Sequence, residues 1–216
     1  MTSTRRTLIL LAVAAAIAAP SAGAAASGHN HAMPGHATKQ VALHDGMRKL
    51  WEDHITWTRL AIVSFAADLP DLSATEARLL ANQRDIGNAI KPYFGRKAGN
   101  RLTALLREHI LGAVELLKAA KSGDQAQIDR AGSAWYANGK QIADFLHGAN
   151  PRYWGRGEMR SMMKMHLDQT LKEAQDRLGG RYAADIRDYE VVHEHILEMA
   201  DELSDGIVKR FPGRFR

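Results

Sequence analysis

Four histidines recur in a similar local pattern, each followed by an isoleucine or a leucine. They are His54, His109, His166 and His195. Each lies near the middle of a segment whose apolar residues are spaced three and four apart, as in a long helix. A buried imidazole needs partners for its nitrogens, and a neutral imidazole is a good ligand for zinc, copper and iron. If the side chains meet, they provide a site for one transition metal ion.

Helical geometry places these histidines at a common depth. The expected helices cover residues 39–68, 97–121, 155–178 and 182–210, and each histidine lies within about two residues of a midpoint, or ~3 Å along the axis. The midpoints of packed helices of similar length share one layer, whichever way each helix runs. The spacing therefore predicts that four imidazoles converge on the axis of a helical bundle.

Three further side chains are candidate ligands of the same metal. Glu173 and Asp85 would add a carboxylate. His193 lies nearer the centre of the expected apolar stripe of its helix than His195 does, so either histidine could be the fourth ligand. The two are two residues apart, and side chains two apart cannot face the same way on a regular helix.

Two other functions remain open for the histidines. Each could pair with a neighbouring hydroxyl or carboxylate in a structural polar network, within a structural or interaction module without catalysis. The same cluster could serve a metal-dependent envelope enzyme, although no pair of residues is spaced to identify its catalytic groups. A di-iron oxidase is disfavoured because only Glu190 and His193 form a Glu-x-x-His pair, and such a centre needs two.

A second group of histidines lies near the start of the chain. His29, His31 and His36 occur with glycine and proline in the segment 27–38, which is expected to be flexible. Imidazoles on a flexible segment can capture Cu(II), Ni(II) or Zn(II) loosely. The alternative is a polar linker that happens to contain histidine.

Residues 1–26 have the parts of a signal peptide. Arg5 and Arg6 precede an apolar stretch at 8–19, which Pro20 ends, and small residues follow. We therefore expect export to the periplasm or beyond the cell, by the general secretory route. The paired arginines leave the twin-arginine route as the alternative. The chain has no cysteine, so it has no disulfide and no thiolate ligand.

The composition limits the kinds of binding partner that are expected. The net charge is +5 over 216 residues, and no basic block is interleaved with aromatic residues, so nucleic acid is not expected to bind. A metal ion is the expected partner. An envelope protein as a second partner, and the oligomeric state, are left open.

Residues 39–216 are predicted to form one all-helical domain. The apolar periodicity and the turns between segments predict about six helices in an up-and-down bundle with a four-helix core. Ser73, with Glu76 three residues on, predicts a capping box, and Asp124 predicts another helix start. Arg59, near His54, is expected to pair with Asp85 or Glu52.

Several short motifs resemble those of a bacterial family of small exported helical proteins. They are Trp51-x-x-His54-x-x-Trp57-Thr58-Arg59, Asn82-Gln83-x-Asp85-Ile86-Gly87 and His195-Ile196-Leu197-x-Met199-Ala200-Asp201. The resemblance extends from about residue 45 to the end of the chain. It implies a helical bundle in the cell envelope, and it assigns no activity and no functional residue.

Overall fold

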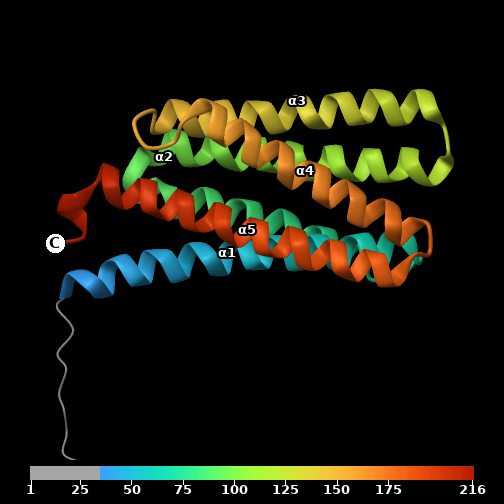
Figure 1. Cartoon of the computed structure of the whole chain (residues 1–216), viewed down its shortest axis with the longest axis horizontal. Helices are drawn as coiled ribbons and strands as arrows, with labels where there is room; N and C mark the ends of the chain where they lie inside the picture. Colours follow the sequence, from blue (N-terminus) through green and yellow to red (C-terminus); the bar gives the residue numbers. More distant parts are fainter. Residues whose placement is uncertain (1–34) are drawn as a thin grey trace, which may run out of the picture. The chain divides into compact units, whose positions relative to one another are not determined.

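The computed structural model describes residues 35–216, with side chains from residue 39 onward. These residues fall in one compact unit, Met33–Arg216, and within residues 35–216 there are five helices and no strand (Figure 1). The elements are α1 (Gly35–Ala66), α2 (Leu72–Ser122), α3 (Gln125–Ala149), α4 (Arg156–Leu178), α5 (Tyr182–Arg210) and a short 3-10 turn, η1 (Pro212–Arg214). The all-helical fold class predicted from the sequence is confirmed.

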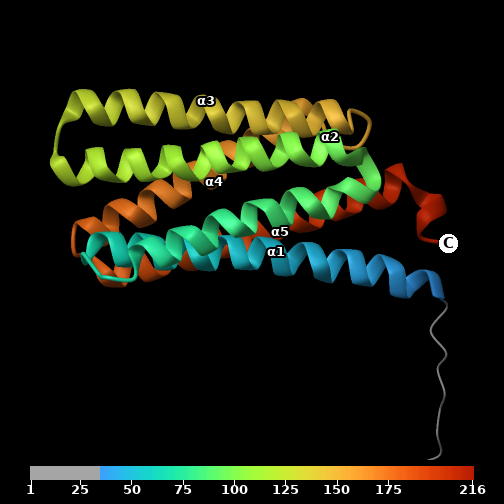
Figure 2. The same cartoon turned by 180° about the vertical axis from the view of Figure 1, so that it is seen from behind.

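The difference from the expected six helices lies in α2, which spans two of them. Gly95 inside α2 has non-helical torsion angles, φ 85° and ψ 166°, a conformation that is accessible almost only to glycine. Figures 1 and 2 show that the chain reverses its direction here. We call residues 72–94 the first arm of α2 and residues 96–122 its second arm.

The two arms of α2 lie close together where two glycines face each other. A Cβ atom on Gly87 would clash with the side chain of Thr103 and would lie 2.6 Å from the carbonyl oxygen of Gly99. A Cβ atom on Gly99 would clash with Lys91 and with the carbonyl of Gly87. Both positions therefore need the smallest side chain for the arms to pack in this way.

Local chemistry explains some of the helix ends. Asp124 caps α3 through its side chain, which accepts a hydrogen bond from the backbone nitrogen of Gln127 at 3.0 Å, so this prediction is confirmed. The predicted capping box at Ser73 is wrong, because α2 already begins at Leu72 and Asp71 precedes it without a side-chain cap. Gly123, with φ 72°, ends α2 in the left-handed region that favours glycine.

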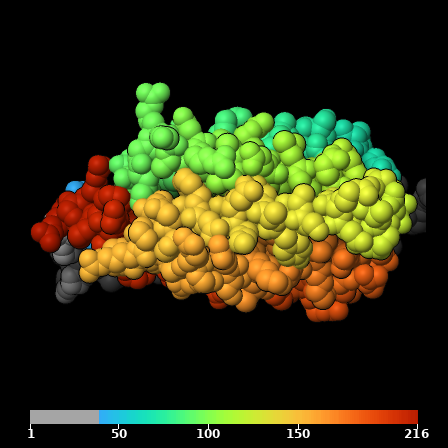
Figure 3. All heavy atoms as spheres, turned by 90° about the horizontal axis from the view of Figure 1, so that it is seen from above, coloured from blue at the N-terminus to red at the C-terminus, as the bar shows by residue number. Residues whose placement is uncertain are grey.

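Each helix packs against its neighbours in the chain, and α1 also packs against α5. Figure 3 shows one face of the unit, on which α3 (yellow) lies between α2 (green) and α4 (orange). The arrangement brings the middles of α1, of the second arm of α2 and of α4 together, and three of the four recurring histidines occupy those positions.

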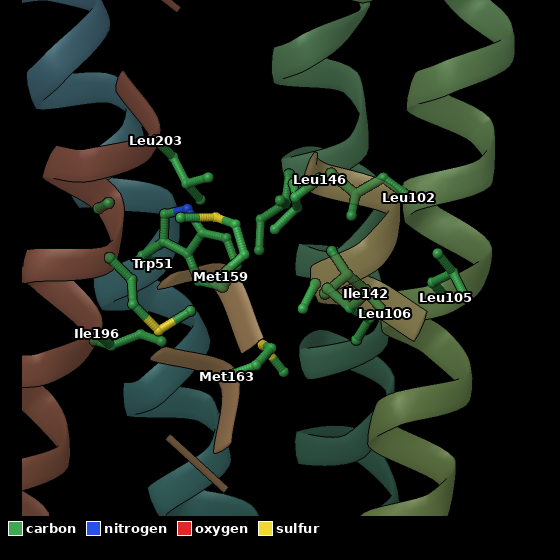
Figure 4. Close-up of a cluster of buried hydrophobic side chains, with 14 of the residues drawn as sticks. Trp51, Leu102, Leu105, Leu106, Ile142, Leu146, Met159, Met163, Ile196 and Leu203 are labelled. Carbon is green, nitrogen blue, oxygen red and sulfur yellow. The ribbon is translucent and has the colours of Figure 1, made fainter. Parts of the chain in front are cut away.

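The main hydrophobic core lies largely to one side of these histidines. Its buried residues come from all five helices, and Figure 4 shows side chains such as Trp51, Leu106, Met163 and Ile196 gathered in it. A second, small cluster on the other side consists of Ala61, Leu79 and Ile110. In the described part of the chain, no helix combines the length and the apolar character that a membrane crossing requires.

Candidate metal centre

Three imidazoles meet in the middle of the helical unit. His54 on α1, His109 on the second arm of α2 and His166 on α4 are each no more than 3% exposed. The ring centroid of His166 lies 5.8 Å from that of His54 and 6.1 Å from that of His109. The sequence prediction that these histidines converge is therefore met for three of the four positions, with His166 in contact with both others.

Burial keeps the three imidazoles uncharged. It lowers the pKa of His54 to about 3, and the neighbouring His109 adds to this effect. Burial lowers the pKa of His109 to about 4, against the opposing effect of a hydrogen bond to Asn138. The pKa of His166 is lowered well below its usual value by burial and then by the nearby histidines, including His195. Neutral imidazole is the form that binds metals.

The hydrogen bonds around His109 fix the position of its proton. Nδ1 of His109 lies 3.2 Å from Oδ1 of Asn138, and the amide nitrogen of Asn138 donates to the backbone oxygen of Leu105. Because that amide orientation leaves only an oxygen facing the ring, Nδ1 of His109 carries the proton and donates. The lone pair on Nε2 is then free. The ring also stacks on Trp135 at 5.2 Å between centroids.

A buried amide that sequence reasoning missed supports His54. The side-chain nitrogen of Gln83, which has two hydrogens, lies 3.3 Å from Nδ1 of His54, 2.8 Å from the backbone oxygen of Leu79 and 3.1 Å from Oδ1 of Asn82. The amide nitrogen of Asn82 in turn donates to the backbone oxygen of Leu50. The sequence marked Gln83 only as part of the motif Asn82-Gln83-x-Asp85-Ile86-Gly87, and the resemblance based on that motif assigned it no role.

His166 is the least satisfied of the three rings. Its Nδ1 is buried and has no hydrogen-bond partner among the described residues. One turn further along α4, the hydroxyl of Thr170 is likewise buried without a partner in that part of the chain. An unpaired buried polar atom costs free energy, typically about 1–3 kcal/mol. Such atoms are therefore candidates for contact with a bound ion or molecule.

The fourth expected histidine does not join this cluster. His195 is buried, but its Nε2 donates to the backbone oxygen of Met162 at 3.0 Å, and its Nδ1 lies 3.7 Å from the exposed carboxylate of Glu198. The suggestion that His193 could replace it is wrong. His193 is partly exposed and hydrogen-bonds to Glu52 at 2.8 Å, because the buried face of α5 is centred on Val192, Ile196 and Met199 rather than on His193.

The two candidate carboxylates also lie elsewhere. Asp85 is exposed on the outer face of α2, so its proposal as a ligand is wrong. Glu173 is fully buried, but it belongs to an ion-pair group with Arg59 and Asp185. It follows His166 by seven residues, or ~10 Å along the helix. The expected pairing of Arg59 with Asp85 or Glu52 is therefore corrected to Glu173 and Asp185.

Glu173 titrates near neutrality in this ion-pair group. Burial raises its pKa to about 7, although the hydrogen bond and the charge of Arg59 act in the opposite direction. Arg59 is shared, since it also binds Asp185 through both carboxylate oxygens. One oxygen of Glu173, Oε2, has no partner among the described residues, which agrees with a carboxyl group that holds a proton easily.

The remaining candidates cannot be placed. His29 and His31 lie outside the described residues, and His36 lies in α1 before the first described side chain. Among the side chains that the structure describes, no group of three or more histidines and carboxylates is arranged to hold a metal ion as it stands. Searches for related proteins found no match among family models, curated proteins or solved structures.

Proposed function

We propose that the chain is an exported up-and-down helical bundle whose buried imidazoles bind one transition metal ion, of zinc, copper or iron. The observation that carries this proposal is the contact of three uncharged imidazoles, His54, His109 and His166, from three separate helices. A hydrophobic core gains nothing from three adjacent polar rings unless their nitrogens are used. Export, and the resemblance to a family of small envelope proteins, belong to the same proposal.

The chemistry of the donors supports a metal. Burial keeps the rings neutral, so a metal ion does not compete with protons for them at neutral pH. His109 has its proton fixed on Nδ1 by Asn138, which is the usual arrangement for a histidine that binds metal through Nε2. His166 contributes a ring whose Nδ1 lacks any other partner in the described chain.

Binding requires the rings to turn. Two nitrogens bound to one zinc ion lie no more than ~4.2 Å apart, since each Zn–N distance is about 2.0–2.1 Å. The ring centroid of His166 lies 5.8 Å from that of His54 and 6.1 Å from that of His109. At these separations two ring nitrogens come within about 4.2 Å of each other only when they face one another. For His54 this means giving up its contact with Gln83. Water or a fourth side chain would complete the tetrahedron, and His195 is the remaining buried histidine of the described chain.

A structural polar layer is the second candidate, and the hydrogen bonds to Gln83 and Asn138 favour it. In this case the histidines and amides would align the helices by pairing with one another, and no ion would bind. Polar groups in a core can fix one arrangement of packed helices at a cost in stability. The two candidates differ in whether purified protein takes up a metal ion.

Metal titration of purified protein without an affinity tag tests the proposal. The starting variant carries His29→Ala, His31→Ala and His36→Ala, so that the histidine-rich segment does not contribute. We expect one equivalent of Zn²⁺ or Co²⁺ to bind by calorimetry, with the visible absorption of tetrahedral Co²⁺. Bound metal raises the melting temperature, because a ligand at 100 times its Kd adds about 2.7 kcal/mol to the stability of the folded state.

Two single substitutions in that background identify the ligands. His166→Ala is expected to abolish the tight binding of one metal ion per protein. His193→Ala removes a partly exposed imidazole bonded to Glu52 and is expected to retain that binding. Circular dichroism checks that both variants fold. Absence of a stoichiometric metal, with no change in melting temperature on adding Zn²⁺, Cu²⁺ or Fe²⁺, would favour the structural layer instead.

A further inference from the structure

An apolar crevice lies beyond the histidines, beside the small cluster of Ala61, Leu79 and Ile110. Its cavity volume is about 60 Å³, it is partly open to solvent, and residues of α1, α2, α3 and α4 line it. Figures 1 and 2 show that the second arm of α2 and α3 diverge from α1, α4 and α5 toward this end.

The crevice is long and its walls are hydrocarbon. On α2 the lining runs from Ile110 to Ala120, and on α4 it runs from Thr170 to Leu178, which corresponds to about 12–15 Å along the helices. Leu117 and Val114 lie on its wall and remain only half-buried. Apolar surface that is accessible within an enclosed crevice is favourable to cover with an apolar ligand.

The inner end of the crevice carries a single unused polar group. Thr170 lines the crevice and is 6% exposed, and its hydroxyl is a buried atom without a hydrogen-bond partner in the described chain. Trp135 lines the crevice as well and stacks on His109. An apolar crevice with one buried hydroxyl that lacks a partner matches a mostly apolar ligand with one polar atom.

The charges near the crevice narrow the class of ligand. Among the described side chains, Glu76 is the one charged residue in its lining, and no lysine, arginine or histidine lines it. A carboxylate or phosphate would therefore lose its hydration without gaining a cation. We propose that this crevice binds an uncharged amphiphile, a hydrocarbon chain that ends in a hydroxyl or carbonyl group, with the polar group bonded to the Thr170 hydroxyl. The site is independent of metal binding.

Displacement of a fluorescent probe tests the site in the purified protein. N-phenyl-1-naphthylamine is expected to gain fluorescence on binding, and 1-decanol is expected to displace it. Decanoate and decylammonium at pH 8 are expected to compete at least tenfold more weakly, because each brings a full charge into an apolar crevice. Equal competition by the three compounds would overturn the assignment of an uncharged ligand, and absence of probe binding would overturn the site itself.

Three variants locate the ligand. Ala113→Phe places a phenyl ring in the crevice and is expected to weaken the probe at least tenfold, whereas Ala126→Phe, on the exposed face of α3, is expected to have no effect. Thr170→Val removes only the hydroxyl. It is expected to weaken 1-decanol about 3- to 10-fold, the share of one hydrogen bond, and to leave the probe unchanged. Unchanged affinity for 1-decanol in Thr170→Val would overturn the assigned polar contact even where Ala113→Phe fails to fold.

Discussion

The three clustered histidines set how the folded protein responds to acid. In metal-free protein the pKa is about 3 for His54 and about 4 for His109, whereas both are near 6.5 in the unfolded chain. Below pH 6.5 the unfolded chain therefore binds protons that the folded chain does not. The contribution of these histidines to stability is complete above pH 6.5 and decreases as the pH falls toward 4.

His109→Gln tests this dependence with a side chain that does not titrate. Each buried histidine contributes up to about 1.4 kcal/mol per pH unit to the slope of unfolding free energy against pH. Between pH 6 and 4.5 the slope of His109→Gln is therefore expected to be smaller than the wild-type slope by about this amount. Urea unfolding at several pH values, with a chelator present, measures the slope. His193→Gln is the control and is expected to keep the wild-type slope. A wild-type unfolding free energy that does not change over this range would contradict the prediction.

The contribution of Glu173 to stability changes with pH in the opposite direction to that of the histidines. Its pKa is about 7 in the folded chain and near 4.3 when unfolded, so its contribution is complete below pH 4.3 and is lost as the pH rises through 7. Glu173→Gln keeps the shape without the titration. Its stability relative to wild type is expected to rise by roughly 1–3 kcal/mol between pH 5 and pH 8.

Urea midpoints at pH 5, 6.5 and 8 check this expectation. The matched control is Glu190→Gln, an exposed position on α5, for which the difference from wild type is expected to stay constant. Parallel curves for wild type and Glu173→Gln would mean that the Glu173 carboxylate stays ionised throughout, held by Arg59.

The burial of three mid-helix histidines could be predicted from the sequence, whereas the burial of an acidic residue near a helix end could not. His54, His109 and His166 lie on strongly apolar faces, so periodicity alone predicted their burial. Asp185 could not be predicted, because it is buried in the first turn of α5 only through its ion pairs with Arg59 and Arg177. Ile186, which follows Asp185, is exposed. The start of the apolar stripe expected along residues 182–210 was therefore misassigned, and as a result His193 was expected to face the core.

At the scale of helices, the α2 reversal depends on three glycines. Gly95 provides the torsion angles, while Gly87 and Gly99 let the arms approach. The sequence predicted a break near Gly95, because one expected helix ends there and the next begins at residue 97. The sequence did not predict close packing at Gly87, because a glycine inside a helix can equally be a residue that only lowers the stability of the helix.

Gly87→Ala is expected to destabilise the protein by about 1–3 kcal/mol, because its Cβ overlaps Thr103 and the backbone of Gly99, which cannot move aside without opening the arms. Gly46→Ala is the matched control. Gly46 lies in α1, and a Cβ atom added there would have no heavy atom of the described chain beyond its own helix backbone within 4 Å. Alanine at this position is therefore expected to stabilise by about 0.5–1 kcal/mol through helix propensity. Thermal unfolding measures both changes, and equal shifts for the two variants would contradict close packing of the arms.

At the scale of the whole helical unit, the histidines lie between the main apolar cluster and the crevice. The main cluster, with Trp51, Met163 and Trp154, fills one end, and the crevice occupies the other. Periodicity predicts which face of a helix is buried, but not how completely the opposing faces fill the space between them. The crevice, and the hydroxyl of Thr170 at its inner end, were therefore beyond reach of the sequence.

This asymmetry predicts different local stabilities within a single helix. In α4, the segment 160–166 includes Met163 of the main cluster, whereas the segment 171–177 lines the crevice with Leu171, Ala174 and Gln175. Local opening is cheaper where fewer apolar contacts must be broken. We expect amide hydrogens of residues 171–177 to exchange about tenfold faster, equivalent to ~1.4 kcal/mol, by mass spectrometry. Equal protection of the two segments would mean that the crevice is closed in solution.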